Sequence, residues 1–93
     1  MTFHYDNDAD ALEIRLADGI VAHTIVIDSG TQVDVDEHGA ALSIEVIRPA
    51  RRVPVNEIIE RFGLEHDDVE ILRSLWAENV RLPFETAHEL AVA

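Results

Sequence analysis

The sequence contains no cysteine and no lysine. The missing cysteines exclude disulfide bonds, thiolate zinc sites and cysteine nucleophiles. The missing lysines exclude a phosphate-binding loop that ends in Gly-Lys-Ser/Thr, because that loop needs its lysine. No Gly-x-Gly-x-x-Gly segment occurs either. We therefore expect neither nucleotide chemistry nor a bound cofactor.

Positive charge is scarce as well, since 7 basic residues face 19 acidic ones and the formal net charge is −12. A negative field repels phosphate backbones, so we expect no direct binding to nucleic acid and favour basic proteins as partners. Long hydrophobic runs are also lacking. The most apolar stretch, residues 20–27, is interrupted by His23 and Thr24 and is too short to span a bilayer. The first residues lack the basic start and apolar run of a signal peptide, so we expect a cytoplasmic protein that does not engage membranes.

What the first half does contain is an alternation of apolar and polar residues with period two, which is typical of half-buried strands. Strands are expected around Phe3 and Tyr5, over Leu12–Leu16, over Ile20–Ile27, around Val33 and Val35, and over Leu42–Val46. Turn-forming residues separate them, and the tightest reversal falls at residues 36–39. The pattern predicts an antiparallel sheet of four to five strands in residues 1–48.

The second half changes to helical spacing. Pro54 suits the first turn of a helix, because its missing N–H is not needed there. Apolar residues then recur at helical spacing up to Gly63, which is placed as a C-terminal cap. A second helix is expected to begin near Asp67, which would cap it together with Glu70, and to carry an apolar stripe of Val69, Leu72, Leu75 and Trp76. Strands followed by helices predict an α+β fold. We expect one domain, residues 1–93, in which two helices of the extension 49–93 pack on the apolar face of the sheet.

Two segments of the first half carry a recognisable pattern. The first is Tyr5-Asp6 followed by Ala9-Asp10-Ala11-Leu12, and the second is Val33-x-Val35-Asp36-x-x-Gly39 followed by Ile44-Glu45-Val46. Together they resemble the two signatures of a bacterial family of unknown function, the YuzE-like small proteins, over about residues 3 to 48. Glu13 stands where that family usually has an aromatic residue, and Ser43 where it usually has glycine. The resemblance implies a small sheet with a helix and no known activity. Some members look like neighbours of toxin-like proteins, which implies an antitoxin or partner-binding role.

Two acidic clusters invite a metal-binding interpretation. Asp34-x-Asp36-x-His38-Gly39-x5-Glu45 has the spacing of an EF-hand calcium loop. However, His38 offers nitrogen where oxygen is needed, and the segment joins two expected strands rather than two helices. The other cluster, Asp6 to Asp10, falls in an expected turn, where such side chains bond their own backbone. We therefore expect no metal site.

The expected function is that of a non-enzymatic protein-interaction module that forms homo-oligomers. A strand that is apolar on both faces, as residues 20–27 are, is either covered twice or lies at an interface. Trp76 fits a core position and an interface anchor equally well. The candidate contact residues are Ile25, Ile27, Leu72, Leu75, Trp76 and Leu82.

Two other functions compete with this one. An antitoxin-like protein would neutralise a basic partner with its acidic sheet face. A small enzyme or ligand-binding domain would use Asp10, Glu45 and the basic patch Arg48–Arg52, and it would require a concave pocket in which those groups converge.

Overall fold

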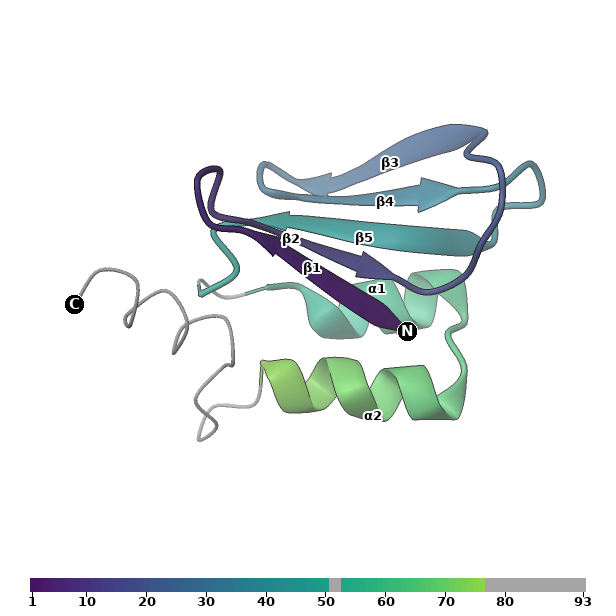
Figure 1. Cartoon of the computed structure of the whole chain (residues 1–93). Helices are drawn as coiled ribbons and strands as arrows, with labels where there is room; N and C mark the ends of the chain where they lie inside the picture. Colours follow the sequence, from purple (N-terminus) through teal and green to yellow (C-terminus); the bar gives the residue numbers. More distant parts are fainter. Residues whose placement is uncertain (51–52, 77–93) are drawn as a thin grey trace.

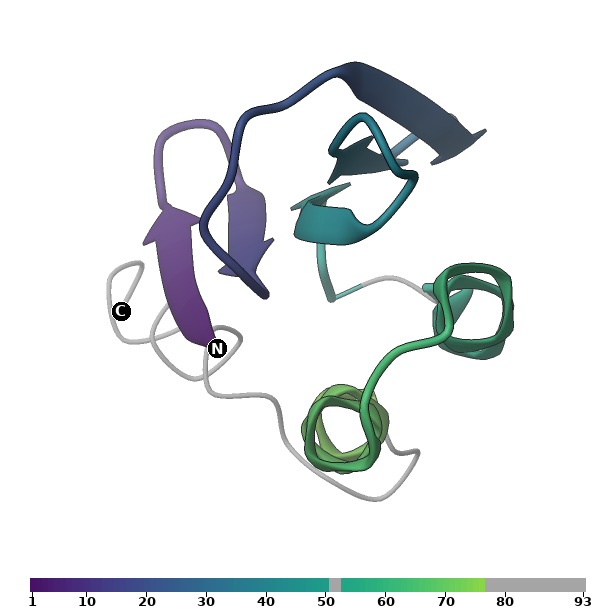
Figure 2. The same ribbon diagram turned by 90° about the vertical axis from the view of Figure 1, so that its right-hand side faces the viewer.

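The computed structural model describes residues 1–50 and 53–76. Its elements are β1 (Thr2–Asp6), β2 (Ala11–Arg15), β3 (His23–Asp28), β4 (Thr31–Val35), β5 (Ala41–Ile47), α1 (Val55–Phe62) and α2 (His66–Leu75). The strands form one antiparallel sheet in the order β1-β2-β5-β4-β3, and both helices lie on the same side of it (Figures 1 and 2). The expected α+β fold is confirmed. No helix in the described ranges is long and apolar enough to cross a membrane.

The connection between β2 and β3 decides which strand lies at the edge. It carries the chain past the ends of β5 and β4 to the opposite edge of the sheet, where β3 lies (Figure 1). This connection makes a Greek-key arrangement. The expectation of a strand over residues 20–27 is therefore wrong in its first part, because the strand begins at His23. Gly19, within this connection, lies close to the side chain of Leu42. A Cβ atom added to Gly19 would lie 2.8 Å from Cδ2 of Leu42, so a larger residue there would push against the core.

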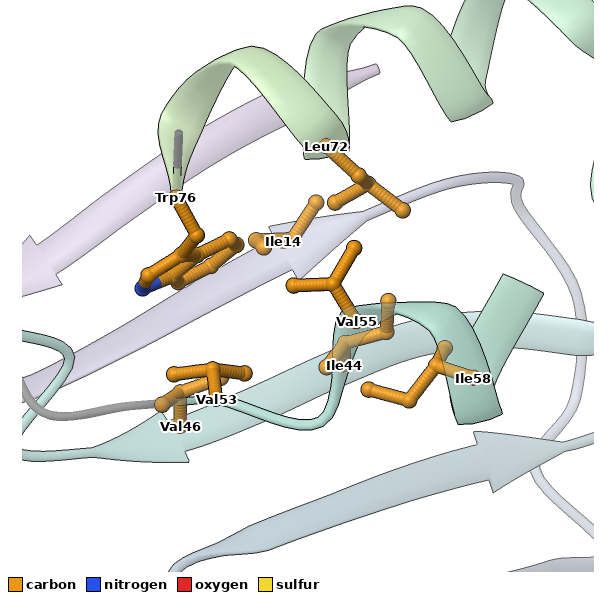
Figure 3. Close-up of a pocket in the computed structure, with 8 residues that line it drawn as sticks. All are labelled: Ile14, Ile44, Val46, Val53, Val55, Ile58, Leu72 and Trp76. Atoms are coloured by element: carbon orange, nitrogen blue, oxygen red, sulfur yellow. The ribbon is translucent and has the colours of Figure 1, made fainter. Parts of the chain in front are cut away.

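The core lies between the sheet and the helices. Buried side chains of β2, β4 and β5 contact three buried side chains from the part of the sequence after the sheet. The cluster consists of Leu12, Ile14, Val33, Val35, Ile44, Val46, Val53, Ile58 and Leu72. Figure 3 shows Ile58 and Leu72 directed at Ile14 and Ile44. Burying one such side chain contributes roughly 1.5–3 kcal/mol. The helices therefore stabilise the sheet by covering its apolar face.

The helix ends agree in part with the sequence. Gly63 ends α1 in the left-handed conformation, with φ 57°, and its N–H donates to the carbonyl of Ile59 at 3.1 Å, as the C-terminal cap requires. The second helix begins at His66 and not at Asp67, and the side chain of its N-cap residue Glu65 makes no capping hydrogen bond. The capping role expected of Asp67 is therefore wrong. Asp67 lies in the first turn, where its negative charge interacts favourably with the helix dipole.

The reversal between β4 and β5 is built as expected. Asp36 accepts hydrogen bonds at Oδ1 from the N–H groups of His38, at 2.8 Å, and Ala40, at 3.0 Å. Gly39 has φ 82°, a left-handed value that glycine adopts without steric cost. The Asp36 carboxylate and the conformation of Gly39 therefore stabilise the turn.

Candidate functional site

Strand β3 is an edge strand, and its two faces differ. Within the described residues it pairs with β4 alone. Ile25 lies opposite Val33, which is fully buried, so Ile25 faces the helices. Val26 lies opposite Gln32 on the face that the helices leave uncovered, and it is 67% exposed. An edge strand presents backbone donors and acceptors along its outer side. β3 is thus a template on which a further strand can pair.

The chain around β3 is apolar and uncharged. Residues 19–27, called the edge segment below, contain no Asp, Glu or Arg. Ile20 and Val21, in the connection that leads into β3, are 89% and 50% exposed. Short exposed segments with strong β-propensity, low charge and no proline favour strand pairing. In a chain of net charge −12, the edge segment is a surface that another acidic molecule can approach without repulsion at the point of contact.

A hollow of about 340 Å³ lies between the edge segment and the β4–β5 turn. It is lined by Gly19, Ile20, Ala22, Asp36, Glu37 and His38. The side chains of Glu37 and His38 are 81% and 80% exposed and contact each other at 3.3 Å. The hollow is therefore open to solvent on its acidic side.

The uncovered face of the sheet carries two carboxylates directly opposite each other. Glu13 of β2 pairs with Glu45 of β5, and the same row continues to His4 on one side and Gln32 on the other. Like charges in that position destabilise a sheet by roughly 0.2–1 kcal/mol. Arg15 donates to Oε1 of Glu13 at 3.1 Å, but both groups are exposed, so solvent weakens this ion pair. The Glu13–Glu45 pair leaves a site of concentrated negative charge on this face.

The neighbouring carboxylate, Asp34, is used by the sheet itself. The Thr24 hydroxyl donates to its Oδ1 at 2.6 Å, and the Ser43 hydroxyl donates to its Oδ2 at 3.2 Å. Asp36 is used by the turn. The residues whose spacing resembles a calcium loop therefore have separate structural roles in a hairpin. Within residues 1–50 and 53–76, no three His, Asp or Glu side chains are placed to hold a metal ion.

A second polar feature joins the β1–β2 turn to the end of β5. The Tyr5 hydroxyl donates a 2.5 Å hydrogen bond to Oδ1 of Asp10. This bond, together with burial and the negative charges of Asp10 and Asp6, raises the pKa of Tyr5 from 10.0 to about 12. Asp10 and Arg48 both have positive φ, 48° and 53°, and the Arg48 N–H donates to the Asp10 carbonyl at 2.7 Å. Two residues in uncommon backbone conformations thus support one another at this corner.

The groups expected to form a ligand site do not converge. Asp10 turns toward Tyr5, whereas Glu45 lies opposite Glu13 on the uncovered face. Neither the hollow beside the edge segment nor the core cavity is lined by Asp10, Glu45 or Arg48. Arg51 and Arg52, the rest of the basic patch, lie outside the described residues.

The candidate contact residues of the second helix face inward. Leu72 is 2% exposed, and Leu75 and Trp76 pack partly buried against the core. The Trp76 Nε1–H donates to the carbonyl of Pro49 at 2.7 Å. In Figure 3, Leu72 and Trp76 flank a cavity of about 10 Å³, roughly the least space that can hold a water molecule. Of the two roles open to Trp76, its contacts favour the core; Leu82 lies outside the described residues.

Comparison with known proteins identifies the first half of the chain. The model of a protein family of unknown function, DUF2283, matches residues 2–48, just over half of the 93 residues. The chain belongs to the DUF2283 family. The match ends with the sheet, so both helices lie beyond the DUF2283 segment. The prediction of a family of unknown function is confirmed, while the likeness to YuzE and the bacterial origin stay predictions. Curated proteins and solved structures gave no significant match.

Most residues that carry the family pattern have a task in the fold of the DUF2283 segment. Leu12 and Ile44 are core residues, and Ala9, Asp36 and Gly39 belong to turns. Asp6, rather than Asp10, bonds the turn backbone, because its Oδ1 accepts from the N–H groups of Asp8 at 3.0 Å and Ala9 at 3.2 Å. Tyr5 and Asp10 bond each other. Glu45 differs from all of these, since it faces away from the core toward another carboxylate.

Sequence reasoning missed two residues of the surface of this DUF2283 protein. The sequence indicates Ile25 and Ile27 as contact residues and leaves Val26 out, because residues 20–27 are apolar on both faces and periodicity alone does not tell which face is covered. In the structure Ile25 and Ile27 pack partly buried against the core, and Val26 is the exposed residue. Only the strand order shows that β3 is an edge strand. Glu13 was noted merely as a departure from the family pattern. Its position opposite Glu45 depends on the β2–β5 pairing, which joins strands distant in sequence.

Proposed function

We propose that this DUF2283 protein is a non-enzymatic protein-interaction module that self-associates along strand β3. The observation that carries the proposal is the 67% exposure of Val26 in the middle of an edge strand. Pairing with a second strand would satisfy the outer backbone groups of β3 and remove apolar surface from water, at roughly 25 cal/mol per Å².

Charge supports the placement of the contact. Two copies that each carry a net charge of −12 repel one another over long distances. A contact is then favourable where charges are absent, and the edge segment has none. Because salt screens repulsion between the rest of the two molecules, added salt should strengthen this association. An association held by ion pairs would weaken instead.

The test is a light-scattering measurement of molar mass over a range of protein concentrations. Val26→Lys places a charge in the centre of β3 and should shift the protein to the monomer. Thr2→Lys is the matched control, because it adds the same charge to an exposed residue of the other edge strand, β1. Self-association that survives Val26→Lys, or that is lost equally in Thr2→Lys, would contradict a contact along β3.

The Glu13–Glu45 pair favours a second candidate function, the binding of a basic partner in the manner of an antitoxin. A guanidinium group placed between the two carboxylates would relieve their repulsion and form charge-assisted hydrogen bonds. A fluorescently labelled oligo-arginine peptide should therefore bind Glu45→Gln more weakly than Glu65→Gln, a control with the same charge change at the start of α2. Equal affinities, or affinities insensitive to salt, would refute this candidate.

The third candidate, a small enzyme built on Asp10, Glu45 and Arg48, has no observation in its favour, because these groups point to different places. We keep the proposal that the protein is not an enzyme. A cytoplasmic location likewise stays a proposal.

A further inference from the structure

We infer that two copies pair their β3 strands in antiparallel orientation about a two-fold axis that passes midway between the two Val26 residues, called the axis through Val26 below. This inference rests on the proposed self-association and specifies which residues of the two β3 strands lie opposite each other, that is, the register. Antiparallel neighbours in one sheet place opposed residues on the same face. One residue must therefore lie directly opposite its own copy across the axis, so that each side chain of the uncovered face meets one from the uncovered face of the second copy.

An axis through Val26 gives the best match of side chains. Val26 then lies opposite Val26 of the second copy, on the uncovered face. Ile25 lies opposite Ile27 of the second copy, on the face that carries the helices. Both residues pack partly buried against the core, so Ile27, the extra residue of the bulge between Val26 and Asp28, stays on this face. Three consecutive cross-strand pairs are then apolar on both sides, and each contributes roughly 0.2–1 kcal/mol.

Other registers match polar with apolar residues. An axis through Ile25 would place Thr24 opposite Val26 and His23 opposite Ile27. An axis through Ile27 would place Val26, the most exposed apolar residue of the strand, opposite the carboxylate of Asp28. Both alternatives bury apolar surface less completely than the axis through Val26.

The two-fold axis has a consequence for the rest of the molecule. An axis perpendicular to the sheet leaves the helices of both copies on one side and both uncovered faces on the other. The two Glu13–Glu45 pairs then lie on the same face of the extended sheet. A basic partner would meet two identical sites on that face, so its second contact would form at high effective concentration.

Single cysteine variants test the register, because the natural chain has no cysteine to interfere. Directly opposed strand residues have Cα atoms roughly 4.5–5.5 Å apart, which suits a disulfide bond. Residues displaced by two positions are roughly 7–8 Å apart, which does not. Under mild oxidation Val26→Cys should form a covalent dimer at least about tenfold faster than Thr24→Cys and Ile25→Cys. Thr24→Cys is the matched control, since Thr24 is exposed on the same face of the same strand.

The remaining outcomes separate the register from the self-association. Faster cross-linking of Ile25→Cys or Thr24→Cys would move the axis and overturn the inferred register, while a contact along β3 would stand. Equally slow cross-linking of all three variants, with a dimeric mass by light scattering, would overturn the register and place either the axis at Ile27 or the contact away from β3. A monomeric mass at every concentration would overturn both the register and the proposed function.

Discussion

Tyr5 offers a sharp test of the local structure, because it is the single tyrosine of the chain. Its hydroxyl can donate to Asp10 only while it is protonated, and this bond is the main reason that the pKa of Tyr5 rises from 10.0 to about 12. Asp10→Asn removes the negative charge that holds the proton. We therefore expect the pKa of Tyr5 to fall back toward 10.0 in Asp10→Asn.

The same bond links stability to pH. The fold favours the protonated phenol, so its contribution is fully present below pH 10 and is lost as the pH rises from 10 toward 12. One pKa unit corresponds to about 1.4 kcal/mol, but Tyr5 is only half-buried and solvent screens the interaction. We expect a contribution of about 1 kcal/mol to the free energy of unfolding at neutral pH. Asp10→Asn should lose this contribution, and its stability should depend less on pH between 10 and 12.

The assay is an ultraviolet titration of the phenolate, with urea-unfolded protein as the reference. Fluorescence of Trp76, the single tryptophan, reports in the same sample whether the fold persists. Asp8→Asn is the control, because it removes the same charge from the same turn, and the charges that act on Tyr5 come from Asp10 and Asp6. A native Tyr5 that titrates near 10.0 in the intact fold, or one that responds equally to Asp8→Asn, would refute the reasoning.

Three further substitutions test the core, a helix end and the uncovered face by urea unfolding. Ile14→Ala empties a fully buried position and should cost about 2–5 kcal/mol; a cost below 1 kcal/mol would contradict its placement. Gly63→Ala should cost about 1 kcal/mol, because alanine disfavours the left-handed cap at φ 57°, and no cost would contradict that conformation. Glu45→Gln should raise stability by roughly 0.2–1 kcal/mol, more at low salt; a loss would show that the Glu13–Glu45 pair is not repulsive.

The local elements of the fold could be predicted from the sequence, because local rules decide them. Period-two alternation located β1, β2, β4 and β5, and Gly39 and Gly63 marked a turn and a helix end by their need for positive φ. The start of β3 could not be located in this way. Residues 20–22 have the composition of a strand, but they belong to the connection that crosses the end of the sheet. The strand order requires this crossing, and the residues themselves do not indicate it.

The candidate surface was predicted less well than the fold. Composition indicated that residues 20–27 needed a partner, but it pointed to the half-buried Ile25 and not to the exposed Val26. Hydrophobicity suggested Leu72 as a contact residue, yet the same property buries it under the sheet. Cross-strand neighbours such as Glu13 and Glu45 lie far apart in sequence, so their meeting depends on the pairing of β2 with β5.

The most direct test of the central claim is the molar mass of the unmodified protein in solution, measured by light scattering at rising protein concentration and at two salt concentrations. The account predicts a mass that approaches twice the 10.4 kDa of one chain, at lower protein concentration when salt is added. A mass that stays at 10.4 kDa up to the highest protein concentration, whatever the salt, would contradict self-association along β3.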